Sequence, residues 1–151
     1  MPHAELRTLL SDLMQANSRL VRIAAQTTGS TESPAVWRTL GVLRSHGAQR
    51  IGELAALSRV AQPTMTKLVA GLAERGWVER IPDVHDARAW QIAITDAGRE
   101  ASDAWRVQLA DALYPYFSDL DDDDIAALRR AVRVLKERVD LNDTNPVEVG
   151  S

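Results

Sequence analysis

Side chains that can hydrogen-bond to base edges and phosphates are gathered in two short segments of this 151-residue chain. The first is a run of amide, hydroxyl and ammonium groups, expected on one face of a helix, from Gln62, Thr64, Thr66 and Lys67; Pro63 lies among them and is a further contact candidate. A helix with such a face fits the major groove of B-DNA, which is about 12 Å wide. The second segment is a loop with Arg88 near its tip, and the negative potential of a minor groove attracts arginine. Together the two segments predict contact with double-stranded DNA.

Residues that flank these segments are further candidates for phosphate contact. They are Ser58, Arg59, Arg75 and His85, and each has the alternative of being a solvated surface side chain. Asp86 is expected to hold either the loop or the Arg88 guanidinium through a charge-assisted hydrogen bond. The alternative for Arg88 is a surface ion pair with Asp86, without DNA.

Residues for other kinds of chemistry do not form a pattern. The chain has no cysteine, which excludes disulfides and thiolate catalysis, and its three histidines (His3, His46 and His85) lack metal-ligand spacing. We find no nucleophile–base pair and no phosphate-cradling glycine loop. His85 beside Asp86 is a suggestive dyad, but a mobile loop is a poor place for a preorganised site. We therefore expect neither an enzyme nor a bound cofactor or metal.

The apolar pattern predicts a helix-turn-helix that would position the first segment. Residues 50–57 form a short helix, and a second helix runs from about Gln62 to a C-terminal glycine, Gly76. Such a motif needs small residues inside its first helix and spaced apolar residues that pack the second against it. Its core positions are Leu54, Ala55, Val60, Met65 and Leu68. The period then changes to two, which predicts strands at 77–81 and 89–94 joined by the loop 82–88.

Amphipathic helices are predicted on both sides of this unit. One covers residues 5–26, and the next begins with Ser33 as N-cap and Pro34 and ends near Gly47. A long helix starts at Thr95, with Pro115 as a candidate kink, and the last carries an apolar seam from Ile125 to Val139. The acidic run 121–124 is interpreted as the start of that helix rather than a metal site. Residues after Asn142 are predicted to be a frayed tail.

These elements define a mostly α fold with a small β-hairpin wing. We expect a single domain over 1–151, with a winged helix-turn-helix head at 33–95 and dimerisation helices at 5–30 and 96–142. Because no apolar run approaches the roughly 18 residues of a membrane span and the N-terminus lacks a secretory signal, we expect a cytoplasmic protein without membrane contact.

Charge by itself does not decide the partner. The net charge is −3; residues 100–151 hold 12 of the acidic and 6 of the basic side chains, and residues 50–99 hold 6 and 7, so the middle of the chain is near neutral. A local patch, not the total, sets the potential at a DNA-binding face. A winged-helix module that binds protein and never touches DNA therefore remains an alternative.

The motifs in combination resemble the signature of the MarR (multiple antibiotic resistance regulator) family. The matching stretches are residues 54–55, 62–72 and 74–80, the wing triplet Asp86-Ala87-Arg88, and 94–99. The close match covers roughly residues 50–100, and the layout of the helices fits nearly the whole chain. The chain departs from the family pattern at Arg59 in place of the turn glycine, Ala61 in place of a serine cap, Ala87 in place of a second wing arginine, and Ile94 in place of leucine. A non-glycine residue such as Arg59 is tolerated at the turn if the turn avoids positive φ.

The resemblance implies a homodimeric transcription regulator, more often a repressor, that reads a pseudo-palindrome with half-sites about one helical turn apart. It further implies a cleft between the dimer helices and the head, where small aromatic effectors lower DNA affinity. Trp37 and Trp105 lie on the helices that would border this cleft, with core packing as the alternative for each. Trp77 and Trp90 are expected to pack the hairpin.

Overall fold

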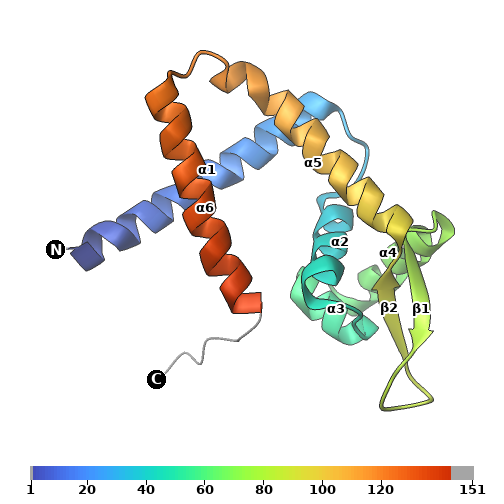
Figure 1. Ribbon diagram of the computed structural model, residues 1–151. Helices are drawn as coiled ribbons and strands as arrows, with labels where there is room; N and C mark the ends of the chain where they lie inside the picture. Colours follow the sequence, from blue (N-terminus) through green and yellow to red (C-terminus); the bar gives the residue numbers. More distant parts are fainter. Residues whose placement is uncertain (1, 144–151) are drawn as a thin grey trace.

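The computed structural model describes residues 2–143, which form six helices and one hairpin (Figure 1). The elements are α1 (Pro2–Thr28), α2 (Pro34–His46), α3 (Ile51–Ser58), α4 (Gln62–Glu74), β1 (Val78–Pro82), β2 (Trp90–Ile94), α5 (Asp96–Phe117) and α6 (Asp122–Asp143). The predicted fold class, mostly α with a β-hairpin wing, is confirmed. Helix α6 extends to Asp143, the first residue of the predicted tail. The rest of that tail, residues 144–151, lies outside the residues that the structure describes.

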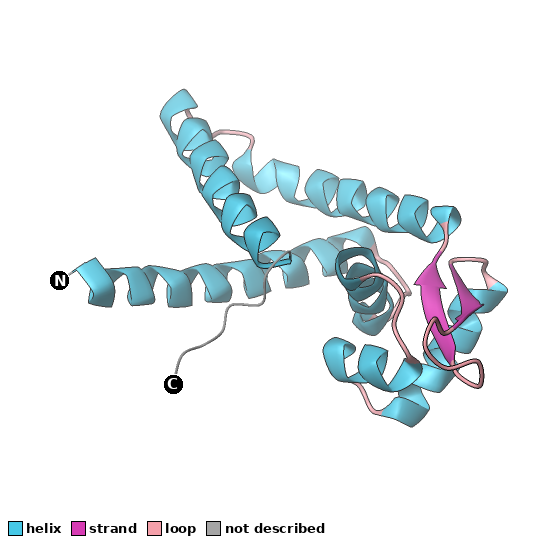
Figure 2. Cartoon of the chain, turned by 60° about the horizontal axis from the view of Figure 1, so that its bottom comes forward, coloured by secondary structure: helices cyan, strands magenta, loops and turns pink. Residues whose placement is uncertain are grey.

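The chain divides into a head and a set of arms (Figure 2). The head contains α2, α3, α4 and the hairpin, and the arms are α1, α5 and α6. Helix α1 packs against α5, and α6 turns back from the far end of α5 (Figure 1). Every residue from 121 to 139 is exposed in the single chain. No helix within residues 2–143 is both long and apolar enough to cross a membrane.

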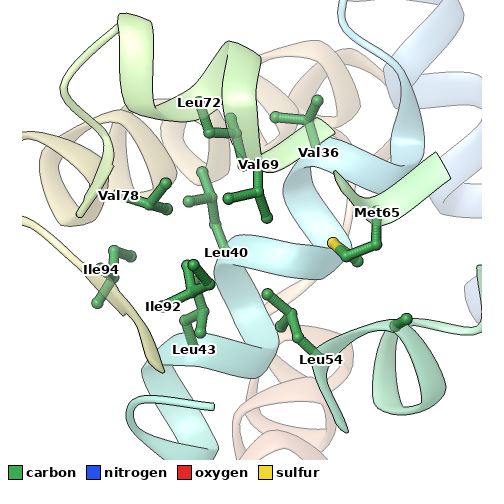
Figure 3. Close-up of a cluster of buried hydrophobic side chains, with 11 residues drawn as sticks. Val36, Leu40, Leu43, Leu54, Met65, Val69, Leu72, Val78, Ile92 and Ile94 are labelled. Atoms are coloured by element: carbon green, nitrogen blue, oxygen red, sulfur yellow. The ribbon is translucent and has the colours of Figure 1, made fainter. Parts of the chain in front are cut away.

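The hydrophobic core lies in the head, where α2, α3, α4 and the hairpin meet (Figure 3). Leu40 of α2, Leu54 of α3 and Met65 of α4 are completely buried. Val78 and Ile94, which pair across the hairpin, close the core from the strand side. The predicted packing of the helix-turn-helix is therefore confirmed, because the spaced apolar residues of each helix face the same interior.

Local caps explain where several helices begin. The Ser33 hydroxyl accepts a hydrogen bond from the Ala35 N–H at 3.2 Å, and Pro34 is the first residue of α2, both as predicted. The Thr95 hydroxyl accepts from the Gly98 N–H at 3.1 Å and so caps α5. Asp121 caps α6 through the Asp124 N–H at 2.8 Å, which confirms the interpretation of the acidic run as a helix start.

The hairpin is antiparallel, with Val78 opposite Ile94 and Pro82 opposite Trp90. Its first strand begins and ends one residue later than predicted. Gln49, between α2 and α3, adds a short bridge on the outer edge of β2. Its N–H donates to the Ile92 carbonyl at 3.0 Å, and the Ile92 N–H donates back at 2.7 Å. This bridge fixes the hairpin to the start of the helix-turn-helix and was not predicted.

The turn between α3 and α4 has a positive φ. Arg59 has φ 57° and ψ 44°, so the turn does not meet the condition under which a non-glycine residue is tolerated without strain. The reason is the close of α3: the Arg59 N–H donates to the Ala56 carbonyl and the Val60 N–H to the Ala55 carbonyl, at 3.2 and 3.1 Å, which requires a left-handed residue there. A side chain at this conformation is strained.

We predict that Arg59→Gly raises the free energy of unfolding by about 1 kcal/mol, because glycine adopts the left-handed conformation without a Cβ clash. Denaturant unfolding of the purified protein measures this. Arg59→Ala is the matched control, since it removes the guanidinium but keeps the Cβ. Equal stability of the glycine and alanine variants would contradict the strain argument.

Candidate nucleic-acid interface

Helix α4 presents one apolar and one polar face. Met65, Val69 and Leu72 recur at helical spacing and are buried in the core. All five predicted contact residues of this helix lie on the exposed side: Gln62, Pro63, Thr64, Thr66 and Lys67. The Thr66 hydroxyl donates to the Gln62 carbonyl at 3.0 Å, so its oxygen lone pairs remain able to accept. The apolar face thus fixes the rotation of the helix and points the polar edge outward.

The loop between β1 and β2 is organised by Asp83, a residue that the sequence did not single out. Its side chain is only 2% exposed. One carboxylate oxygen accepts from Arg50 Nε at 2.9 Å and Gln91 Nε2 at 3.2 Å. The other accepts from the backbone N–H groups of His85 and Asp86, at 2.9 and 3.0 Å. An aspartate directly after a proline at a strand end is a turn signal that could have marked it.

The charge state of Asp83 follows from these contacts. The Arg50 hydrogen bond first, and then the His85 N–H, hold the pKa of the Asp83 carboxyl well below its usual range, although burial opposes this. Asp83 in turn raises the pKa of Arg50. A charged carboxylate therefore ties the wing loop to the residue that precedes α3.

Asp86 holds the loop backbone, which is one of the two roles predicted for it. Its carboxylate accepts from the Arg88 N–H at 3.0 Å. Arg88 and Asp86 form no ion pair within residues 2–143. The side chains of Arg88 and His85 are exposed on this loop. The backbone of Arg88 is thus held by Asp86, and its guanidinium is on the outside of the molecule.

The other flanking candidates divide into three cases. Ser58 is completely buried, which corrects the expectation that it contacts phosphate: the end of α3 packs inward, and Arg38 Nη1 donates to its carbonyl at 2.9 Å. Arg59 is exposed at the turn. Arg75 forms an ion pair with Glu32 and lies over the Trp77 ring, 4.9 Å from its centroid. A phosphate would have to compete with these partners of Arg75.

Three tryptophans meet between the head and the arms. Trp37 stacks on Trp105 with ring centroids 4.8 Å apart and an interplanar angle of 7°, and Trp77 lies 5.8 Å from Trp37. Trp37 and Trp105 also line a cleft of about 290 Å³. Each of the two therefore packs against the other and also forms part of the cleft wall. The other residues along the cleft are Val21, Ala25, Ser30, Glu32, Pro34 and Arg38. Trp90, expected to pack the hairpin, is 57% exposed.

A helix-turn-helix followed by a hairpin, with the polar edge of its second helix and a loop arginine both exposed, defines a winged helix-turn-helix protein. Comparison with known proteins agrees with this class. Residues 33–89 match the sequence profile of the MarR family.

Relatives extend the match to most of the chain. An uncharacterized HTH-type transcriptional regulator of Mycobacterium leprae is 32% identical over 133 residues, which cover 87% of this chain and 93% of that protein. The HTH-type transcriptional repressor IacR of Pseudomonas putida is 26% identical over 99 residues, 66% of this chain and 59% of that protein. The crystal structure of transcriptional regulator Tm0710 from Thermotoga maritima superposes with a TM-score of 0.71 at 24% identity, over 92% of this chain and 99% of that one. This chain belongs to the MarR family of transcription regulators, as its motifs predicted.

We predict that Asp83 makes stability depend on pH in acid. Because its folded pKa is depressed, its contribution is complete above the unfolded value of about 3.9 and is lost as the pH falls through the folded pKa. The stability difference between the wild type and Asp83→Asn should therefore shrink below about pH 4. Urea unfolding at a series of pH values measures it. Two parallel stability curves across that range would rule out the proposed charge on Asp83.

Proposed function

We propose that this regulator acts as a homodimer that binds a pseudo-palindromic DNA operator and represses transcription. The observation that carries the proposal is the exposure of two contact groups on the same head, the polar edge of α4 and the Arg88 loop. An α-helix enters a major groove, and an arginine beside it reaches the adjacent minor groove. Repression is supported by the similarity to IacR, which is a transcriptional repressor.

A second copy of the chain is the partner that the arms require. The apolar seam of α6 includes Leu128, Val132 and Leu135, which are 48, 49 and 36% exposed. The start of α1 exposes Leu6 and Leu9 by more than half. A stripe of large apolar side chains this long is unfavourable in water, so a partner surface of the same kind would cover it. Two heads related by a two-fold axis would then read two half-sites.

The cleft beside Trp37 and Trp105 is the candidate site for a small aromatic effector. Its size, about 290 Å³, is near the lower limit for small-molecule sites. Its walls are mainly apolar, and within residues 2–143 the buried Trp37 Nε1–H has no hydrogen-bond acceptor. A bound molecule would lower DNA affinity if it favoured a head-to-head separation that no longer matches the half-sites.

The alternative function is a winged-helix module that binds protein without DNA. The weak charge of residues 50–99, with 7 basic and 6 acidic side chains, favours this alternative. The experiment below separates the two, because DNA binding through basic side chains depends strongly on salt. We further propose that the protein works in the cytoplasm, where a regulator would meet its operator.

We predict that Lys67→Ala and Arg88→Ala each weaken binding to an operator selected from a random DNA pool, by about fivefold or more. Each variant should also lower the slope of log affinity against log salt by about two per dimer, since one phosphate or groove contact is lost in each subunit. Fluorescence anisotropy at several salt concentrations measures both quantities.

The control is Arg130→Ala, which removes an exposed arginine from the opposite side of the α6 seam. It should leave both affinity and slope unchanged. Wild-type affinity in both the Lys67 and Arg88 variants would disprove the assigned contacts, and the absence of any salt-sensitive binding by the wild type would favour the protein-binding alternative.

We predict that Leu128→Glu combined with Val132→Glu converts the dimer to a monomer, because charges would be buried unpaired in the seam. Sedimentation velocity gives the mass, and Arg130→Glu, on the outer side of α6, should remain dimeric. A wild-type chain that sediments as a monomer would refute the dimer.

A further inference from the structure

We infer that Glu32, Arg75 and the contacting tryptophans Trp37, Trp77 and Trp105 form a joint between head and arms, and that this joint determines which half-site spacing the dimer accepts. The inference rests on the proposed binding of a homodimer to an operator. It assigns to Arg75 a positioning role in place of the phosphate contact predicted for it. It also makes Glu32, which lies outside the DNA-facing segments, a determinant of specificity.

The tryptophans connect the head to one arm. Trp105 belongs to α5, Trp37 to α2, and Trp77 to the link between α4 and β1. The near-parallel stack of Trp105 on Trp37, at 4.8 Å, joins arm to head, and Trp77 extends the contact toward the end of α4. Aromatic pairs at these distances resist sliding because both dispersion and the ring quadrupoles depend on their geometry. The end of α4 is thereby linked to α5.

Arg75 and Glu32 add contacts that connect Trp77 to the loop between α1 and α2. Arg75 immediately follows α4, and its guanidinium lies over Trp77. The same guanidinium pairs with Glu32, which lies in the loop between α1 and α2. The side chains of Glu32 and Arg75 are 24 and 43% exposed, so water screens the pair only in part. Through this pair, the end of α4 is held to the loop that leaves the other arm, α1.

A second set of contacts restrains the rotation of the head about the tryptophans. Arg44 of α2 pairs with Asp103 of α5 at 2.6 Å and donates to the Arg99 carbonyl at 3.2 Å. The start of α5 approaches the link between α4 and β1 so closely that a Cβ on Gly98 would lie 2.1 Å from the Trp77 carbonyl oxygen. The head is therefore attached to α5 at two separate places, which restrains its rotation on the arm.

A restrained junction has a consequence for DNA. In a dimer built through the arms, the orientation of each head on its arm sets the separation of the two α4 helices. One base pair added between half-sites moves them apart by about 3.4 Å and rotates them by roughly 35°. Such a change exceeds what a restrained head can follow without strain. Glu32 also lines the cleft beside Trp37, so a molecule bound there shares a wall with the ion pair that sets the head orientation.

The test measures affinity of the full-length dimer for duplexes that carry two selected half-sites at the best spacing and at one or two base pairs more or fewer. The wild type is expected to bind one spacing best. Glu32→Gln removes the ion pair while leaving every side chain of the α4 edge and the wing in place. We expect it to reduce the ratio of affinities between the best and the next spacing by about threefold or more. Affinity for a duplex with a single half-site should stay at the wild-type value.

Glu74→Gln is the matched control, because it removes the carboxylate next to Arg75 and changes the charge of the chain equally. It should keep the wild-type spacing preference. The same preference in Glu32→Gln as in the wild type would overturn the inference, as would an equal loss at every spacing and at the single half-site. A wild type that binds none of the duplexes would instead refute the proposed function on which the inference rests.

Discussion

The structure depends on the packing of helix α4, which has one buried apolar face and one exposed polar face. Met65, Val69 and Leu72 of α4 must reach the core formed by α2, α3 and the hairpin, and this burial provides the driving force that holds α4 in the head. Because a helix turns by a fixed angle per residue, burying these three positions also determines which side chains face outward. The outward edge from Gln62 to Lys67 is therefore a consequence of core packing, and no separate interaction is needed to aim it.

The wing depends on the same core. Val78, Ile92 and Ile94 contribute to it, so the hairpin strands are held on the side of α4 that faces the interior. The reciprocal hydrogen bonds between Gln49 and Ile92 and the buried Asp83 carboxylate then fix the loop to the start of α3. A loop held by backbone hydrogen bonds and a charged carboxylate loses less conformational entropy on binding than a free one. The exposed Arg88 thus belongs to the rigid part of the molecule.

The features that the sequence predicted are those encoded by local spacing. Burial at every third or fourth residue located the helices, alternation located the strands to within one residue, and the cap at Ser33 follows from a side chain next to its own helix. The features that escaped prediction join residues far apart in the chain. Arg50 and Asp83 are 33 residues apart, and Glu32 and Arg75 are 43 apart. No local period encodes such pairs, and the burial of Ser58 likewise depends on how α2 lies against α3.

These distant pairs also affect the charge of the surface at α4 and the wing, in a head whose residues 33–95 hold 8 basic and 5 acidic side chains. Asp83 and Glu32, two of the acidic residues near the recognition unit, are engaged with Arg50 and Arg75 away from the outer edge of α4. Among residues 2–143, Arg59, Lys67 and Arg88 form no ion pair, and all three are exposed. Asp83 at the wing base and Glu32 between α1 and α2 are thus paired, whereas the cations at the turn, on the edge of α4 and on the wing loop are not. Since the potential at a surface falls off within roughly a Debye length of 8–10 Å, a phosphate backbone at that edge would respond to the nearby cations more than to the total.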